Sequence, residues 1–324
     1  MKYFITGATG FIGGRLARQL REAGHEVVAV VRNPAKAQDL AQLGVTLHRG
    51  DVTEKESMRE PITGVDGVFH VAGWYKVGVR DKSQAYAINV QGTRNVLELM
   101  KELNIKKGVY TSTLAINSDT HGVEADESYH FTGKHISVYD QTKAEAHDVA
   151  VKMIREGLPL VIVQPGLVYG PGDTSSVRTS LVQYLTKKLP VMPQQTAFSW
   201  AHVDDIANAH WLAMEKGKLG ENYNICGATH TFINALEIAK EITGVKLPMA
   251  VPAGMIRVMS AMMYVLDKFI PVPESYTGEG LRIIAGVTYI GGNAKAKREL
   301  GFNPRPLKEG LAETLKHEMG LLGM

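Results

Sequence analysis

Three tyrosines in the sequence are each followed by a lysine four residues later, a spacing that can create an acid catalyst. On a helix, residues four apart share one face, so the lysine ammonium lies near the phenol. A nearby cation lowers the phenol pKa from about 10, which makes the tyrosine a usable proton donor near neutral pH. The three pairs are Tyr139/Lys143, Tyr184/Lys188 and Tyr264/Lys268.

Only the first of these pairs is placed where a ligand crevice is expected. Tyr139 begins a helical pattern between apolar runs at 108–112 and 160–163 that are typical of strands. In an open α/β sheet, ligands bind outside the carboxyl ends of parallel strands. The first of these strands ends in Thr111-Ser112-Thr113, which supplies a hydroxyl that can orient a carbonyl. We expect the other two pairs to lie on surface helices.

Three glycines at intervals of three residues follow the first apolar run. The segment Thr6-Gly7-Ala8-Thr9-Gly10-Phe11-Ile12-Gly13 stands between a strand pattern and a helix pattern. Here the first glycine permits a tight turn, the second lets backbone approach a pyrophosphate, and the third lets helix and strand pack closely. The helix N-terminus adds partial positive charge. The segment therefore predicts a dinucleotide site.

The end of the second strand indicates which dinucleotide is bound. An acidic residue about 20 positions after the glycines would bond the ribose 2′-hydroxyl and repel a 2′-phosphate. The sequence has Val30-Val31-Arg32-Asn33-Pro34 there, with no carboxylate before Asp39. A guanidinium at Arg32 can bind a phosphate through two hydrogen bonds, with Lys36 as a second charge. We expect NADP(H) over NAD(H); the alternative is that Arg32 is an ordinary surface residue.

The elements around these residues alternate between apolar runs and helical periodicity, which is typical of α/β proteins. Strands are expected at 3–5, 27–31, 45–48, 68–72, 108–112 and 160–163, with helices at 34–43, 85–104 and 139–156 among others. The pattern predicts a Rossmann-type doubly wound parallel sheet in residues 1–170. We expect residues 171–324 to form a smaller, mainly helical substrate-binding region, interleaved with the first because segments near 201–230 return to the sheet.

Several motifs together resemble the extended short-chain dehydrogenase/reductase family, also called the NAD-dependent epimerase/dehydratase superfamily. Beyond the glycine segment and Tyr139/Lys143, these motifs are Gly50-Asp51-Val52, residues 68–72, 89–93, 164–172, 202–207 and 300–304. The resemblance covers nearly the whole chain. The pattern is most similar to reductases of the dihydroflavonol-reductase and 3β-hydroxysteroid-dehydrogenase type.

This resemblance implies a role for each matching residue. Tyr139 would protonate the carbonyl oxygen, Lys143 would hold the phenol pKa down and bond the nicotinamide ribose, and Thr113 would orient the carbonyl, with support from Ser112 left open. Asn89 would position the long helix and the active-site loop. A homodimer through helices 88–103 and 139–156 is also implied. The implied cofactor-binding residues are Gly7, Thr9, Gly10, Phe11, Ile12, Gly13, Arg32, Lys36, Asp51, Val52, Val71, Ala72, Gly73, Asn89, Tyr139, Lys143, Pro165, Gly166 and Val168.

At two positions the chain departs from the motifs of the family's sugar-nucleotide enzymes, which favours a carbonyl reductase or alcohol dehydrogenase. Sugar-nucleotide epimerases and dehydratases usually carry Asp-Asn after the second strand and an arginine shortly before the His-Val-Asp-Asp segment. This chain has Arg32-Asn33 and Phe198-Ser199-Trp200 at those places. An NAD-dependent epimerase or dehydratase remains the alternative. A protein that only senses NADP(H) is a second alternative, disfavoured because the chain keeps the Tyr/Lys pair.

Aromatic residues and methionines dominate the region expected to bind substrate. Trp74 and Tyr75 follow the fourth strand, Trp200 lies near the expected mouth of the cleft, and methionines 249, 255, 259, 262 and 263 line one helical stretch. A flexible thioether wall suits an aromatic or alicyclic carbonyl compound, although methionine stripes are more often core. Arg178 is expected to be available for a charged group of the substrate.

Composition excludes several classes of partner. The 36 basic and 33 acidic residues leave a net charge of +3, too even to predict binding to nucleic acid. Cys226 is the only cysteine, which excludes an intramolecular disulfide, and the 11 histidines form no compact metal motif, so we expect no metal. We expect a cytoplasmic protein without a targeting or transmembrane segment. The stretch 255–273 is interrupted by three charged residues and predicts an amphipathic helix, with contact to a membrane surface as an alternative.

Overall fold

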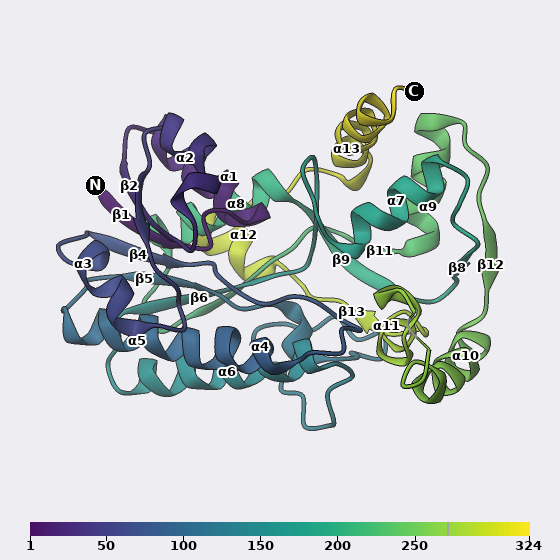
Figure 1. The fold of residues 1–324 in the computed structure, drawn as a ribbon, viewed down its shortest axis with the longest axis horizontal. Coiled ribbons are helices and arrows are strands. Elements are labelled where there is room, and N and C mark those ends of the chain that lie inside the picture. The colour runs from purple at the N-terminus through teal and green to yellow at the C-terminus, as the bar shows by residue number, and fades with distance from the viewer. Residues whose placement is uncertain (271) are drawn as a thin grey trace.

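A parallel sheet of seven strands forms the centre of the computed structural model, which describes residues 1–270 and 272–324 (Figure 1). The strand order is β10-β6-β5-β4-β1-β2-β3, and every neighbouring pair is parallel. The chain winds outward from β1 to β3 and then crosses to β4, so the direction of winding reverses between β1 and β4. The predicted doubly wound sheet is confirmed. Its strands are β1 (Lys2–Thr6), β2 (Glu26–Val31), β3 (Thr46–Arg49), β4 (Gly67–His70), β5 (Gly108–Thr111), β6 (Leu160–Pro165) and β10 (Asn222–Ile225).

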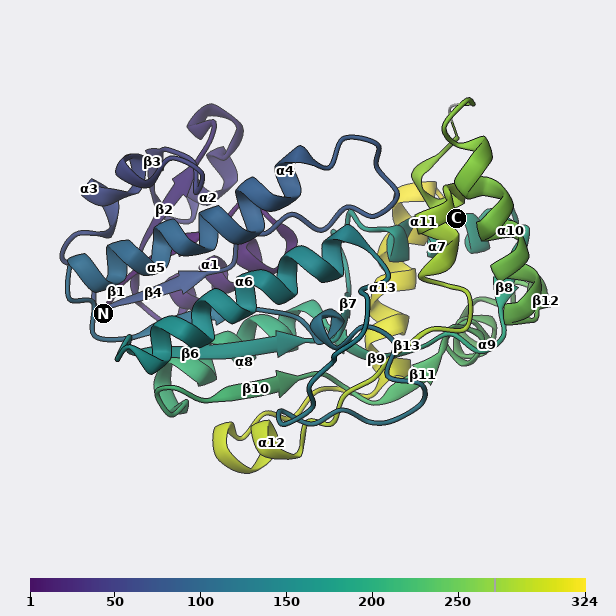
Figure 2. The same cartoon turned by 90° about the horizontal axis from the view of Figure 1, so that it is seen from below.

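Helices cover both faces of this sheet, and side chains from each strand alternate between the two cores (Figure 2). In β1, Tyr3 and Ile5 enter one core while Phe4 enters the other. The first core lies under α1 (Phe11–Glu22) and α8 (Val203–Lys216), and α12 (Ala294–Leu300) joins it. The second lies under α5 (Thr93–Glu102) and α6 (Val138–Arg155), with α3 (Arg59–Ile62) at its edge. Both faces are buried, which explains why the strands are continuous apolar runs.

Two of the predicted helices are interrupted. The stretch expected at 85–104 begins as α4 (Ser83–Ala85), continues as the π-helical turn η3 (Tyr86–Gly92) and only then becomes α5. Such π turns are rare and occur often at functional sites. The stretch expected at 34–43 divides into a 3₁₀ turn, η1 (Pro34–Lys36), and α2 (Gln38–Gln42), because the Asn33 side chain caps the amide of Ala35 and starts a tight turn.

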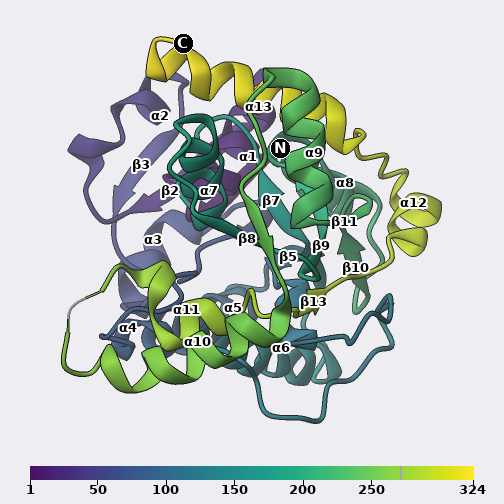
Figure 3. The same cartoon turned by 90° about the vertical axis from the view of Figure 1, so that its right-hand side faces the viewer.

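The carboxyl-terminal part forms a second lobe beside the carboxyl ends of the strands (Figure 3). It contains two small sheets that the sequence pattern did not indicate, because most of their strands have only two or three residues. One sheet contains β7 (Leu167–Tyr169), β9 (Ala197–His202), β11 (Thr229–Thr231) and β13 (Thr288–Tyr289), and the other pairs β8 (Val191–Pro193) with β12 (Met249–Val251). The helices are α7 (Ser176–Leu185), α9 (Phe232–Thr243), α10 (Ala253–Leu266), α11 (Gly278–Arg282) and α13 (Leu307–Leu322). β10 and α8 leave this region and complete the central sheet and its cover.

Candidate active site

The glycine segment forms a tight turn between β1 and α1. Gly7 has φ of +75°, and a Cβ there would lie 2.6 Å from the backbone nitrogen of Ala72. A Cβ at Gly13 would overlap the carbonyl oxygen of Gly7, which shows how closely α1 packs on the turn. Gly10 begins α1 without a side-chain cap, and the first turn of the helix holds no acidic residue. Thr9 and Gly10 are exposed, and Phe11 and Ile12 half-buried, so this helix end can receive an anion.

Gly13 provides a direct test of this turn. We expect Gly13→Ala to weaken binding of a dinucleotide at least tenfold and to lower the melting temperature, because the Gly7 carbonyl is backbone and cannot rotate away. Isothermal titration and a thermal melt measure both effects. Gly320→Ala is the matched control, since a Cβ at that helical position meets open space. A Gly13→Ala protein that binds like the parent would show that the turn is not the dinucleotide site.

The charged residues predicted to select the cofactor lie at the edge of the sheet where the glycine turn is found. Thr6 pairs with Val30 in the register of β1 and β2, so Arg32 follows the strand beside the glycine turn. Arg32 and Lys36 are exposed, and neither makes an ion pair within residues 1–270 and 272–324. Asp51 has a structural task, because its Oδ1 accepts hydrogen bonds from the amide and hydroxyl of Thr53, both at 2.8 Å. That Asp51 binds the cofactor stays a prediction.

Thr113 and Tyr139 come together at the carboxyl end of β5. Thr113 caps the 3₁₀ turn η4 (Leu114–Asn117), its Oγ1 accepting from the amide of Ala115 at 3.2 Å. Tyr139 lies in the first turn of α6, which Ser137 caps by accepting from the amide of Asp140 at 3.1 Å. Burial raises the pKa of Tyr139 to about 12, and a hydrogen bond from Thr113 opposes this effect. The two hydroxyls therefore form one site with a phenol that is protonated at neutral pH.

Lys143 is buried one turn after Tyr139 and points toward β5. Its Nζ donates to the carbonyl oxygen of Thr111 at 2.8 Å and to the hydroxyl of Tyr110 at 3.3 Å, and it lies 4.9 Å from the centre of the Tyr110 ring. Burial lowers the pKa of Lys143 to about 7. Burial dominates the phenol pKa, and the Lys143 ammonium bonds β5, so the expectation that Lys143 lowers the phenol pKa stays a prediction. Asp140, the residue after Tyr139, has a pKa that burial raises to about 7, so both it and Lys143 titrate near neutral pH.

Asn89 connects the active-site loop to the catalytic helix. It lies in the π turn η3, where its Oδ1 accepts from the amide of Trp74 at 2.7 Å. Its Nδ2 donates to the carbonyl of Trp74 at 3.0 Å and to the hydroxyl of Thr142 at 2.9 Å. These bonds fix the end of the loop that starts with Val71, Ala72 and Gly73. A Cβ at Gly73 would lie 3.9 Å from the Lys143 ammonium, so this loop borders the lysine.

The remaining predicted cofactor residues follow β6 or lie beneath the long helix. Pro165 ends β6, and a Cβ at Gly166 would overlap the carbonyl of Ser199, so only glycine fits between β6 and β9. Val168 is half-buried in β7. Val52 is buried against Gly92, and its carbonyl accepts from Asn95 at 2.8 Å. All three segments follow carboxyl ends of the sheet strands, although no contact to a cofactor tests them.

Two buried histidines beside Lys143 were not identified as part of the site from the sequence. His70 bonds Thr6 through Nδ1 at 2.8 Å and Thr93 through Nε2 at 3.0 Å, and it stacks on Tyr110. His147 bonds the hydroxyl of Ser112 through Nδ1 at 2.9 Å, which gives Ser112 a partner other than Tyr139. The position of His147, four residues after Lys143 on one helix, was the signal available in the sequence.

Buried histidines make the fold sensitive to acid. Burial lowers the pKa of His70 to about 3 and those of His147 and His210 to about 4. The unfolded chain protonates them near pH 6.5, so each contributes stability above that pH that is lost as pH falls toward its folded pKa. At pH 5 the loss is about 2 kcal/mol for each histidine.

Urea unfolding at pH 7 and pH 5 measures this loss. We expect His210→Gln to reduce the difference between the two pH values, since His210 is fully buried and bonds Thr111 and the Ile206 carbonyl. His121→Gln is the control, because that side chain is 82% exposed. An unchanged pH dependence in the His210 variant would contradict this explanation.

Two of the residues expected to contact substrate have other roles. Trp200 is 2% exposed, packs among Tyr169, Phe198 and Phe232, and donates from Nε1 to the His230 carbonyl at 3.1 Å. The prediction that it contacts substrate is wrong because it belongs to the core of the second lobe.

Arg178 is also committed to the protein. Its Nε donates to Glu318 at 2.8 Å, and that carboxylate is 1% exposed, so the expected availability of Arg178 for a substrate is wrong. Trp74 is half-buried and Tyr75 exposed, with the Tyr75 hydroxyl 3.1 Å from that of Thr174 across the two lobes. These two remain candidate substrate contacts.

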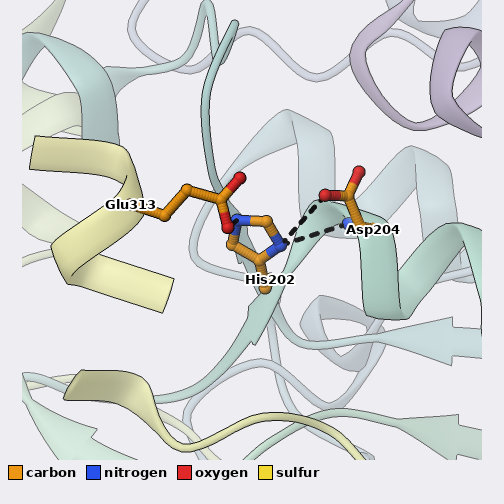
Figure 4. A group of neighbouring side chains, drawn as sticks. All are labelled: His202, Asp204 and Glu313. Atoms are coloured by element: carbon orange, nitrogen blue, oxygen red, sulfur yellow. Dashed lines mark hydrogen bonds and ion pairs between the residues drawn. The ribbon is translucent and has the colours of Figure 1, made fainter. Parts of the chain in front are cut away.

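His202, Asp204 and Glu313 form a further polar cluster, where the side chains of the two acids lie on opposite sides of the imidazole (Figure 4). Three such groups can hold a metal ion, but each carboxylate already has a cationic partner. Arg15 lies 3.5 Å from Asp204, and Arg305 lies 3.0 Å from Glu313. Arg15 also donates to the carbonyl of Pro171 at 2.8 Å. The cluster therefore connects α1, α8 and α13, and its charges are balanced by protein groups.

Comparisons with known proteins agree with this fold and site. The profile of the NAD dependent epimerase/dehydratase family matches residues 3–226. The chain belongs to this family, and its relatives place it among the NAD(P)-dependent oxidoreductases. A Synechocystis protein provisionally named dihydroflavonol 4-reductase is 30% identical over 97% of this chain and 93% of its own length. Sterol demethylase protein B of Methylococcus capsulatus is 27% identical over 97% of both chains.

Solved structures show the same architecture. The crystal structure of gox2253 covers 99% of this chain and 98% of its own, with a TM-score of 0.85 and 29% identity. UDP-glucose 4-epimerase from Thermotoga maritima, solved with UDP-glucose, covers 99% of this chain and all of its own, with a TM-score of 0.79 and 25% identity. The fold is thus shared with gox2253 and with a UDP-glucose 4-epimerase.

Proposed function

We propose that this protein is an NADP(H)-dependent reductase of a small, largely apolar ketone or aldehyde, acting through Thr113, Tyr139 and Lys143. The observation that carries the proposal is the placement of three groups at the carboxyl edge of the sheet: Thr113 follows β5, Tyr139 lies in the first turn of α6 with Thr113 lowering its pKa, and Lys143 is buried one helical turn away. These groups lie where a carbonyl oxygen can meet two hydroxyl donors. The reverse reaction, oxidation of an alcohol, uses the same groups.

The residues present fit a bound dinucleotide phosphate. The glycine turn leaves no room for a Cβ at Gly7 or Gly13, and the α1 amides at its end face solvent without an acidic neighbour. Arg32 and Lys36 would bind the 2′-phosphate, and Lys143 the nicotinamide ribose. NADP(H), when bound, supplies or accepts the hydride. The loops 71–73 and 165–168 would flank the cofactor on its two sides.

Proton delivery follows from the protonation states of the site. During reduction, a hydride adds to the carbonyl carbon and the Tyr139 O–H gives its proton to the carbonyl oxygen, which leaves a phenolate. A pKa of about 12 keeps Tyr139 protonated at neutral pH, which favours its role as acid. Thr113 would stabilise the phenolate by a hydrogen bond. The positive charge of protonated Lys143 would also stabilise the negative charge of the phenolate, from a greater distance. Thr113 would also orient the substrate oxygen.

Relatives support an apolar substrate. Their names refer to dihydroflavonol reduction, sterol demethylation and reduction of a farnesylated quinoline oxide, all of which involve largely apolar molecules. On this chain, the loss of Trp200 and Arg178 as substrate contacts leaves Trp74 and Tyr75 as candidate substrate contacts. A panel of aromatic, alicyclic and terpenoid ketones with NADPH, followed at the nicotinamide absorbance, tests the proposal.

An epimerase of nucleotide sugars is the second candidate, because structures of such enzymes share the fold. The position that would hold a pyrophosphate-binding arginine lies in β9 and carries Phe198, Ser199 and the buried Trp200. The buried Ser199 bonds the Gly291 carbonyl and Thr229, which leaves no cation at this place. Conversion of a UDP-sugar to its epimer without net change of cofactor would overturn the reductase proposal.

A further inference from the structure

Helix α10 presents an apolar face to solvent. We define the α10 face as the following exposed residues: Met255, Val258, Met259, Met262, Val265, Leu266, Phe269 and Ile270. Val258 is 61% exposed and Phe269 80%. Their spacing of three and four residues forms one continuous stripe on the helix and the turn that follows it. Contiguous exposed apolar patches often mark interaction sites.

The helix is anchored to the protein by its opposite side. Ala253, Ile256 and Ser260 are buried, and Ile256 packs with Leu281 and Ala285 of the following segment. Ser260 donates to the carbonyl of Gly278 at 2.7 Å. The α10 face is therefore not a displaced part of the core, because the helix already has a core-facing side.

Positive charges border the α10 face. Lys268 directly precedes Phe269 and is exposed, whereas Arg257 lies on the anchored side of the helix, where its Nε donates to the Ala285 carbonyl at 3.1 Å. Arg80, from the loop after β4, donates to the carbonyls of Asp267 and Ile270 and so holds its guanidinium at the end of the stripe. Asp267 is the only acidic residue between 253 and 273, and its carboxylate is turned inward to accept from the Gly278 amide at 2.9 Å. An apolar stripe bordered by cations matches the surface of an anionic bilayer.

We propose that the α10 face binds the surface of an anionic phospholipid bilayer, with its apolar side chains in the interfacial layer and Arg80 and Lys268 at the phosphates. The contact is a surface one, because none of the helices in the described residues has the length and apolar composition needed to cross a bilayer. The inference concerns where the protein binds and does not depend on the proposed reaction.

A second copy of the chain fits the same face less well. In a two-fold symmetric dimer each patch meets its own copy, so Arg80 and Lys268 would face the same cations of the second copy. The stripe carries no outward carboxylate to pair with them. Lipid phosphates supply the missing negative charge.

The α10 face is also connected to the catalytic helix. After α10, Glu279 of α11 accepts from the amide of Val138 at 2.8 Å, at the start of α6, and pairs with Lys82 at 2.8 Å. Gly78 donates to the same carboxylate at 3.3 Å. A protein docked through α10 would therefore hold the loop at 78–82 and the Tyr139 end of α6 close to the bilayer, where apolar molecules dissolve.

Co-sedimentation of the full chain with vesicles tests the proposal. We expect binding to phosphatidylcholine vesicles that contain phosphatidylglycerol, weaker binding to phosphatidylcholine alone, and a decrease at high salt. The variant Val258→Glu/Val265→Glu/Phe269→Glu should reduce the bound fraction at least tenfold. The matched control Leu219→Glu/Leu321→Glu alters exposed leucines elsewhere and should bind like the parent. The charge variant Lys268→Glu should reduce binding to the anionic vesicles and leave the weaker binding to phosphatidylcholine unchanged.

Circular dichroism shows whether the variants are folded. If the triple variant does not fold, the charge variant still tests the proposal. If the parent does not sediment with anionic vesicles, the proposal is overturned. Equal binding of the parent and the charge variant would overturn it as well. A parent that is a stable dimer by light scattering, and a triple variant that is monomeric, would also overturn it, because a second copy would then cover the face.

Discussion

We expect Tyr139→Phe to lower the rate of hydride transfer by about 10²-fold or more, because the phenol proton is the one that the carbonyl oxygen must receive. The ring remains, so the packing at the start of α6 is preserved and binding of NADPH should change little. The measurement is the rate of NADPH oxidation with the best ketone found in the panel. The decrease should appear in kcat as well as in kcat/KM, since the proton is transferred in the chemical step.

Tyr264→Phe is the matched control for this change. Tyr264 also precedes a lysine by four residues, and the Lys268 ammonium lies 5.8 Å from its ring, but it is 55% exposed on α10. It should retain the parent rate. A Tyr139→Phe enzyme within tenfold of the parent would show that another group is the acid.

Arg32→Asp should reverse the cofactor preference from NADP(H) to NAD(H). The guanidinium has no ion-pair partner in the described part of the chain, so its charge is free for a 2′-phosphate. A charge-assisted bond of this kind contributes about 1.5–3 kcal/mol, which corresponds to at least tenfold in affinity, and a carboxylate would add repulsion of the phosphate. Ratios of kcat/KM for NADPH and NADH measure the effect.

Two controls make the Arg32 result specific. Arg18→Asp introduces the same charge change at an exposed position of α1 and should leave the preference unchanged. Lys36→Ala should weaken NADPH binding less than Arg32→Ala, because an ammonium forms a point contact where a guanidinium forms two bonds. A parent enzyme that binds NAD(H) as tightly as NADP(H) would refute the assignment of Arg32.

The nucleotide half was predictable because its signals are local. The glycine turn, β1 and α1 are consecutive, and the side chain of Arg32 follows β2 directly, so spacing and strand order place them together. The same holds for Tyr139 and Lys143 on one helix. The direction of these side chains could not be predicted locally, because it depends on distant residues. Lys143 bonds Thr111 and Tyr110 on β5, more than 30 positions earlier.

The substrate half could not be predicted in the same way. Arg178 is paired with Glu318, 140 positions later in the chain, and Trp200 is enclosed by Tyr169 and Phe232 from other elements. Neither partner is visible in the residues around Arg178 or Trp200. For α10, the spacing predicted an amphipathic helix, but only the structure shows that the methionine side is the exposed one.

We propose a reductase with an exchangeable NADP(H) cofactor, and one assay tests this most directly. Purified protein with NADPH is given apolar ketones and, in parallel, UDP-glucose. The nicotinamide absorbance and the sugar products are recorded together. The structure predicts stoichiometric oxidation of NADPH with at least one aromatic or alicyclic ketone and no change in the UDP-sugar. Epimerisation of UDP-glucose without net loss of NADPH absorbance, and no turnover of any ketone, would contradict it.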